Sequence, residues 1–119
     1  MIQSVNATGD AIGGNTAAQR NVISNNNVSI NLTNGVSDHI MQFNDIGINP
    51  SGTSAIPNQL VGGDIDTNAT GNLIADNLIS GNGIKGIEIQ DPTTAFKIIV
   101  RNKIGTNAAS KIPAKTSEA

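Results

Sequence analysis

The segment Asn21-Val22-Ile23-Ser24-Asn25-Asn26 recurs later in the chain as Asn77-Leu78-Ile79-Ser80-Gly81-Asn82. A second element, Asn44-Asp45-Ile46-Gly47-Ile48-Asn49, recurs as Asn102-Lys103-Ile104-Gly105-Thr106-Asn107. The residues that follow the second element also correspond between its two copies, as a Ser-x-Ile-Pro motif. Internal repeats at a fixed period are typical of solenoid proteins, in which each repeat is one small structural unit.

The Asn-x-Ile element occurs twice within each long repeat, so the elementary period is about 24 residues and the chain contains about five such units. Between these elements lie short stretches with alternating apolar residues, at 28–32, 84–89 and 96–100. Alternation with period two is typical of strands that have one buried face. Since no sustained helical period occurs in the first 110 residues, the sequence predicts an all-β chain.

A unit of about 24 residues cannot bury its apolar side chains alone, and stacking of successive units solves this problem. When units stack about 4.8 Å apart, inward Ile and Val residues pack on the same positions of the neighbouring units. An inward Asn that is repeated in register can donate its amide to the next Asn and form a ladder. We expect a ladder at Asn21, Asn44, Asn77 and Asn102. The alternative is that these residues lie in surface turns with left-handed backbone.

The composition suits a narrow interior of this kind. The 119 residues include 17 Asn, 18 Ile and 13 Gly, whereas two Phe are the only aromatic residues and Cys is absent. β-branched residues fill a thin core, and Asn and Gly make frequent turns. The absence of Cys excludes disulfides and thiolate metal sites. We expect neither a membrane span nor an export signal in this chain, because no long apolar run occurs.

The net charge of −2 conceals an uneven distribution along the sequence. Residues 1–82 contain six acidic residues and one basic residue, whereas residues 83–119 contain six basic and three acidic residues. If sequence order follows the axis of a solenoid, this distribution favours head-to-tail contact between copies. The alternative is that solvated charges fell this way by chance. Nucleic-acid binding is disfavoured, because the chain is slightly acidic and poor in aromatic residues.

Two longer stretches, residues 12–24 and residues 44–53, carry a family resemblance. They resemble repeats of the parallel β-helix superfamily that includes pectate lyases, and they are most similar to the repeats of bacterial surface and secreted proteins. The resemblance covers about residues 10–113 and implies a right-handed parallel β-helix at the cell surface or outside the cell. It does not specify an activity, since the superfamily includes lyases, hydrolases, epimerases, adhesins and proteins without known catalysis.

We therefore expect residues 1–113 to form a single β-helix domain of about five turns, followed by a disordered polar tail at 114–119. Two double-turn repeats, at about 11–58 and 60–113, make up this domain. Relatives of this kind usually have more turns and end caps, whereas no amphipathic helix is available here as a cap. Uncapped ends expose strand edges and apolar core, so the chain is expected to form homo-oligomers through its ends or to belong to a larger protein.

The metal candidate is the segment Asp64-Ile65-Asp66-Thr67-Asn68. Oxygen ligands at alternate positions suit Ca²⁺, and Asp64, Asp66 and Asn68 match positions one, three and five of the helix-loop-helix calcium loop. The match fails further on, because Ala69 replaces the required Gly and Ala75 replaces the bidentate Glu. The alternative is an ordinary polar corner loop.

The catalytic candidates are the only histidine, His39, and the carboxylates of Asp38 and Asp45. Asp38 could orient the imidazole as a base, and Asp45 lies six residues further on. Neighbouring strand residues point to opposite faces, so a solvated histidine at a strand edge is the alternative. The resemblance implies that a polysaccharide lyase would use Ca²⁺ and an Arg or Lys base. Arg101 and Lys103 could share one face of a strand, but no catalytic motif of the family is present.

We favour a structural or ligand-binding solenoid module, with a polysaccharide as the ligand class, that requires no cofactor. One alternative is a hydrolase of ester, lactone or glycosidic bonds or a polysaccharide lyase, which would use acidic side chains on the solenoid face, with or without Ca²⁺. Another is a unit whose purpose is self-assembly. Because aromatic residues are scarce, a sugar site is expected to rely on hydrogen bonds from Asn, Asp and Thr. An enzyme would gather several of six residues in one cleft: Asp38, His39, Asp45, Asp64, Asp66 and Asp76.

Overall fold

The structure is a computed structural model that describes residues 1–95 and 97–106. Within these ranges twelve strands form three parallel four-stranded sheets, and the only helical segment is the short 3-10 helix η1 (Ala17–Gln19). The β1 sheet contains β1 (Ile2–Val5), β4 (Val28–Thr33), β7 (Val61–Ile65) and β10 (Lys85–Ile89). The β2 sheet contains β2 (Ala11–Gly13), β5 (Ile40–Gln42), β8 (Leu73–Ala75) and β11 (Ile98–Val100). The β3 sheet contains β3 (Val22–Ile23), β6 (Asp45–Ile46), β9 (Leu78–Ile79) and β12 (Lys103–Ile104).

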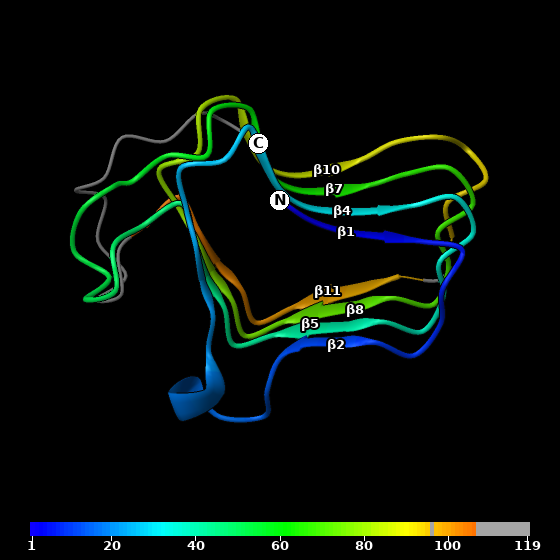
Figure 1. Cartoon of the computed structure of the whole chain (residues 1–119), viewed down its shortest axis with the longest axis horizontal. Coiled ribbons are helices and arrows are strands. Elements are labelled where there is room, and N and C mark those ends of the chain that lie inside the picture. Colours follow the sequence, from blue (N-terminus) through cyan, green and yellow to red (C-terminus); the bar gives the residue numbers. More distant parts are fainter. Residues whose placement is uncertain (96, 107–119) are drawn as a thin grey trace.

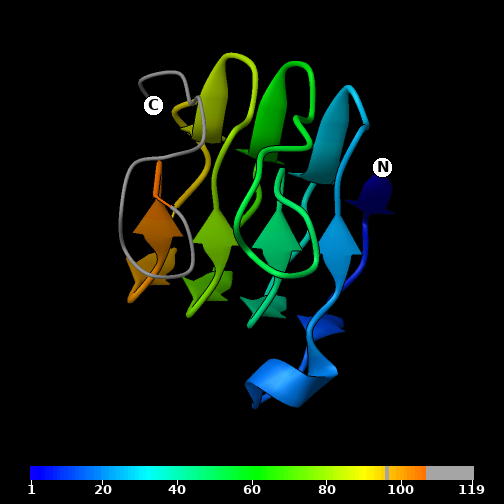
Figure 2. The same ribbon diagram turned by 90° about the vertical axis from the view of Figure 1, so that its left-hand side faces the viewer.

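The chain passes through the three sheets in the same order four times, as Figure 1 shows. We call each pass a winding, so β1, β2 and β3 form the first winding and β10, β11 and β12 the fourth. Each strand pairs in parallel with the equivalent strand of the next winding, for example β1 with β4 and β2 with β5. The windings therefore lie side by side (Figure 2). The predicted all-β class is confirmed, and the parallel sheets fit a repeat fold of the solenoid type.

The described residues contain four windings rather than the expected five turns of about 24 residues. Equivalent residues of the β3 sheet are separated by 23, 33 and 25 residues in successive windings. The longest step contains an excursion at 47–60 that lies outside the three sheets. Division of the chain length by a period of about 24 residues therefore gives too many windings, because one winding is longer than this. The expected tail at 114–119 and the end of the second repeat at 107–113 lie outside the described residues.

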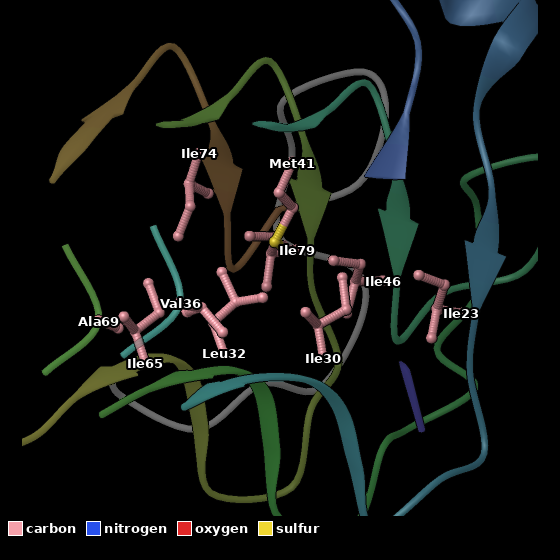
Figure 3. Packing of buried hydrophobic residues seen from close by; sticks show 10 residues of the cluster. All are labelled: Ile23, Ile30, Leu32, Val36, Met41, Ile46, Ile65, Ala69, Ile74 and Ile79. Carbon is pink, nitrogen blue, oxygen red and sulfur yellow. The ribbon is translucent and has the colours of Figure 1, made fainter. Parts of the chain in front are cut away.

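The core consists of inward aliphatic side chains that stack in register, as the sequence predicted. Ile23, Ile46 and Ile79 occupy equivalent positions in the β3 sheet, and Met41 and Ile74 are neighbours in the β2 sheet. These side chains are buried and form one cluster with residues of the β1 sheet (Figure 3). Each winding therefore buries its apolar side chains against the next winding, which a single winding could not do.

The predicted ladder of Asn21, Asn44, Asn77 and Asn102 is confirmed. The Nδ2 atom of each donates to Oδ1 of the next, at 3.2, 3.1 and 3.0 Å. Each Oδ1 atom from Asn44 onward also accepts the backbone N–H of the preceding ladder residue. Asn44 and Asn77 are buried, so these bonds satisfy polar groups that water does not reach. The alternative, that the four residues lie in surface turns, is wrong for the two central ones.

A second ladder, at Asn26, Asn58 and Asn82, was not predicted. Asn26 donates to Oδ1 of Asn58 at 3.3 Å, and Asn58 donates to Oδ1 of Asn82 at 2.9 Å. Nδ2 of Asn58 also donates to the backbone oxygen of Ile23 at 3.0 Å. Two inward amide ladders therefore tie the windings together at opposite ends of the β3 strands.

In the described part of the chain, no helix has the length and apolar character that a membrane-crossing helix requires.

Candidate binding groove

Each winding turns from the β2 sheet into the β3 sheet at the residue directly before the ladder Asn. These residues form what we call the corner column: Arg20, Phe43, Asp76 and Arg101. In three windings the residue has a positive φ angle, of 56° at Phe43, 56° at Asp76 and 53° at Arg101. Left-handed backbone costs a residue with a Cβ atom about 1 kcal/mol or more, and Gly or Asn adopts it at less cost. The corner therefore contains two unfavourable residue types, Phe43 and Arg101, whereas Asp76 tolerates this conformation.

Two ion pairs involve residues of the corner column. Nε of Arg20 lies 3.1 Å from Oδ2 of Asp45, and Nη2 of Arg20 donates to the backbone oxygen of Pro50 at 3.0 Å. Arg101 grips Asp76 with two parallel hydrogen bonds, Nε to Oδ1 at 2.8 Å and Nη2 to Oδ2 at 3.0 Å. A two-pronged pair of this kind fixes the orientation of both side chains. From the first winding to the fourth, the charged groups along the outer surface of this corner are therefore basic, acidic, acidic and basic.

The two carboxyl groups experience opposite environments. Burial raises the pKa of Asp45 above its usual value, and the nearby Arg20 only partly opposes this effect. Hydrogen bonds from Arg101, and then from Gln42, lower the pKa of Asp76. Nε2 of Gln42 donates to Oδ2 of Asp76 at 2.8 Å. The groove thus contains one carboxyl group that holds its proton more tightly than usual and one that holds it less tightly.

A groove of about 300 Å³ runs along the outside of the β3 sheet at this corner. Phe43 and Leu78 give it an apolar floor between the two ion pairs. The excursion 14–20, which contains η1, forms a wall at the first winding and projects beyond the sheets (Figure 1). The lining residues are Ala17, Arg20, Phe43, Asp45, Asp76, Asn77, Leu78, Arg101 and Lys103. An apolar floor with a few convergent polar groups is typical of a ligand site.

His39, the predicted base, is a buried structural residue in the corner before the β2 sheet. Its Nδ1 accepts the backbone N–H of Asp10 at 3.1 Å, so the proton of the neutral ring lies on Nε2, which is 2.7 Å from Oγ of Ser4. The backbone N–H of His39 donates to Oδ1 of Asn72 at 3.0 Å. His39 therefore takes the place of a ladder residue. The alternative of a solvated histidine is wrong, because only 1% of His39 is exposed.

The structure does not bring the three catalytic candidates together. Asp38 is exposed and has a φ angle of 57°, whereas Asp45 lies on β6 and pairs with Arg20. Among the described residues no hydrogen bond or ion pair links Asp38, His39 and Asp45 to one another. Asp45 is the one of the three that lines the groove, and a catalytic role for any of them stays a prediction.

The calcium candidates lie on the outer face of the β1 sheet and in the turn that follows. Asp64 accepts hydrogen bonds from Nδ2 of Asn31 at 3.4 Å and from Nε2 of Gln90 at 3.0 Å. Asp66 is bonded to the hydroxyl of Thr33, and the backbone N–H of Asn68 donates to Thr93. In the two described ranges, no group of three or more His, Asp or Glu side chains is placed to hold a metal. The carboxylate oxygen atoms of Asp64 and Asp66 instead meet amide and hydroxyl donors.

The sequence predicted part of the groove. Asp45 and Asp76 were among the acidic candidates. Arg101 and Lys103 were expected to share one face of a strand; both line the groove, but Arg101 lies in the corner before β12 and not on a strand. Phe43 and Arg20 were not singled out. The signal for both was available, because each directly precedes an Asn of the repeated Asn-x-Ile element.

Comparison with known proteins adds no relative: no family model, no curated protein and no solved structure matches the chain. The resemblance to pectate-lyase-like repeats therefore depends on residues 12–24 and 44–53. The function has to be inferred from the chemistry of the groove, since a fold by itself does not specify an activity.

Proposed function

We propose that the chain is a right-handed parallel β-helix module of the pectate-lyase-like type, from a bacterial surface or secreted protein, that binds a carbohydrate in the groove. The fixed order of the three parallel sheets and the two asparagine ladders support the solenoid. The right hand is supported by the strong preference for right-handed connections between parallel strands of one sheet.

The corner column is the observation that carries the binding proposal. Phe43, Asp76 and Arg101 all have left-handed backbone, and all three line the groove. Residues held in costly backbone conformations cluster at functional sites, where the position of the side chain matters more than the cost. Phe43 and Arg101 support a selected surface, because Asn or Gly would serve folding better at both positions, whereas Asp76 tolerates left-handed backbone.

The groove offers the two kinds of contact that a sugar ring needs. Sugar hydroxyl groups both donate and accept, and the pairs Arg20–Asp45 and Arg101–Asp76 place donors and acceptors along the groove. The C–H face of a sugar can pack on the ring of Phe43 between these pairs. The side chain of Arg101 is 65% exposed, so it can contact a ligand without loss of core packing.

The test is binding of the chain to an array of plant, fungal and bacterial cell-wall oligosaccharides, followed by calorimetry on the best ligand. Phe43→Asn removes the ring and keeps a residue that adopts left-handed backbone well. We expect this variant to bind at least about tenfold more weakly and to fold normally. Ile40→Thr is the control, because Ile40 is exposed on β5 and does not line this groove. Equal binding by Phe43→Asn and the wild type would contradict the proposal, as would no binding by the wild type.

The opposite pKa shifts of Asp45 and Asp76 favour a second candidate function, hydrolysis of a glycosidic or ester bond or a lyase reaction. Carboxyl groups whose environments move their pKa values apart suit the roles of acid and base. Binding is better supported, because each carboxylate is held by an arginine. Glycans, esters and lactones screened with and without Ca²⁺ distinguish the two functions. Turnover that is lost in Asp45→Asn and in Asp76→Asn would establish the enzyme.

A further inference from the structure

The two ends of the stack of windings are complementary to each other. The strands β1, β2 and β3 pair only with the second winding, and within the described ranges β10, β11 and β12 pair only with the third. These two sets of strands lie at opposite ends of the stack (Figure 2). Because all the sheets are parallel, a second copy could extend each sheet without a change of strand direction.

The asparagine ladder has a direction that leaves matching groups at its two ends. In each step the backbone N–H of one winding donates to the side chain of the next, as from Asn44 to Asn77 at 2.9 Å and from Asn77 to Asn102 at 3.0 Å. Among residues 1–95 and 97–106, the backbone N–H of Asn102 has no partner, and Oδ1 of Asn21 accepts no hydrogen bond. A copy stacked in register places this donor against this acceptor.

A second set of equivalent positions, Asp10, His39, Asn72 and Lys97, has an acidic residue in the first winding and a basic residue in the fourth. The backbone N–H of Asp10 donates to His39 and that of His39 donates to Asn72, at 3.1 and 3.0 Å. The register of β8 with β11 places Lys97 next in this column. The first winding therefore ends in the carboxylate of Asp10, whose side chain is 62% exposed and lies 3.6 Å from Nε2 of His39. The fourth winding ends in the ammonium of Lys97, which donates to the backbone oxygen of Thr94 at 3.2 Å. No partner for the backbone N–H of Lys97 lies in the described ranges, so Asp10 of a second copy could accept it and also form an ion pair.

The inward aliphatic positions and the corner column also allow the fourth winding of one copy to pack on the first winding of another. Inward aliphatic side chains are exposed at both ends, with Ile2 at 38% and Ile104 at 41%. Stacking in register sets Ile87 on Ile2, Ile99 on Ile12 and Ile104 on Ile23 of the next copy. Arg101 would lie over Arg20, but each guanidinium is already paired with a carboxylate of its own copy.

We propose that copies of this chain stack head to tail, with the first winding of one copy continuing the three sheets of the fourth winding of another. The contact joins two different surfaces, so it can repeat and build open-ended assemblies instead of a closed dimer. It does not depend on the groove or on its ligand.

The test uses two charge reversals in the full chain, Asp10→Lys and Lys97→Asp, with sedimentation velocity over a concentration series. The wild type is expected to form a series of growing species, which weaken as salt screens the ion pair. Either variant alone places like charges at every junction and should weaken assembly by about tenfold or more. In an equimolar mixture every junction between unlike variants has opposite charges, so the two variants should alternate and assembly should be restored. Gln59→Lys, an exposed change in the excursion 47–60, is the control and should assemble like the wild type.

Far-ultraviolet circular dichroism of each variant checks that it is folded, and recovery in the mixture requires two folded partners. A wild type that stays monomeric at about millimolar concentration would overturn the proposal. A closed dimer that neither reversal affects would also overturn it, because it would show that a different surface holds the copies together.

Discussion

Phe43 and Asn44 are neighbours in the sequence, but the corner between the β2 and β3 sheets separates their roles. Asn44 is fully buried, donates to Asn77 and to the backbone oxygen of Ile12, and accepts from Asn21. Phe43 lies in the outer groove with a φ angle of 56°. The inner residue is held by hydrogen bonds on both sides, whereas the outer residue has an unfavourable backbone and no equivalent of its own type in the next winding.

The same contrast holds along all four windings. The inner position is Asn every time, and its amide donates to one neighbour and accepts from the other in the same ladder. The outer position is Arg, Phe, Asp and Arg in turn. A position that is the same in every winding indicates a folding requirement, and an adjacent position that varies among the windings is where specific chemistry can be placed.

Removal of a central ladder amide should have the largest effect. Asn77→Ala deletes the bonds to Asn102 and to the backbone of Met41, and it leaves the buried Asn44 without its acceptor. We expect the free energy of unfolding to fall by about 3 kcal/mol, measured by chemical denaturation. Asn27→Ala is the control, since Asn27 is exposed and is not among the residues with left-handed backbone, and it should cost less than about 0.5 kcal/mol. A small effect at Asn77 would mean that the ladder does not hold the windings together.

His39 should behave as a ladder residue that happens to be an imidazole. His39→Ala removes the acceptor of the Asp10 N–H and the partner of the Ser4 hydroxyl, and it opens a cavity, so we expect a loss of about 2 kcal/mol. His39→Asn restores an acceptor at the same position and should cost about 1 kcal/mol or less. Equal losses in the two variants, measured by thermal and chemical unfolding, would show that packing alone explains the position.

The two groove carboxylates should change the pH dependence of stability in opposite directions. The pKa of Asp76 is lowered below 3.8 in the fold, so its stabilisation is present at neutral pH and is lost as the pH falls through the folded pKa. The pKa of Asp45 is raised above 3.8, so its contribution is present at low pH and is lost as the pH rises through the folded pKa. Denaturation between about pH 2 and pH 6 should give Asp76→Asn a shallower acid-side loss than the wild type, and Asp45→Asn a steeper one. Slope changes of the same sign would contradict these environments.

Replacement of the outer residue should have the smallest effect on folding. In Phe43→Asn, the relief of unfavourable backbone offsets the loss of packing, so the free energy of unfolding should change by less than about 1 kcal/mol. Chemical denaturation alongside Asn77→Ala measures the contrast directly. A loss as large as that of Asn77→Ala would show that the corner column is part of the fold, like the ladder beside it.

Much of the inner structure could be predicted from the sequence, because stacking imposes it at every winding. The ladder residues Asn21, Asn44, Asn77 and Asn102 were identified from the repeat, and the stacked isoleucines followed from the two-residue alternation. The second ladder was missed because the excursion 47–60 separates Asn26 from Asn58 by 32 residues and breaks the period. The same excursion adds residues to one winding, which is why the sequence predicted five turns where the described residues form four windings.

The groove could be predicted only in part, because it has no period of its own. A loop outside the sheets, such as the excursion 14–20, is not constrained by stacking, so the sequence does not show which surface it will adjoin. His39 was predicted to be a base or a solvated residue, whereas its contact with Ser4 depends on the first winding lying beside the second. Because Asp38 is next to His39 in the sequence, it was predicted to be the partner of the imidazole. The ring instead contacts Ser4 and Asp10, which belong to the first winding.

The most direct test of the account is a titration of the ¹⁵N-labelled chain with the best-binding oligosaccharide, followed by amide chemical shifts. If the corner column forms the site, the largest changes will occur at Phe43, Asp76 and Leu78, and the amides of Asn31 and Asp64 on the outer face of the β1 sheet will not move. Changes centred on the β1 sheet, or no saturable changes with any oligosaccharide of the array, would contradict it.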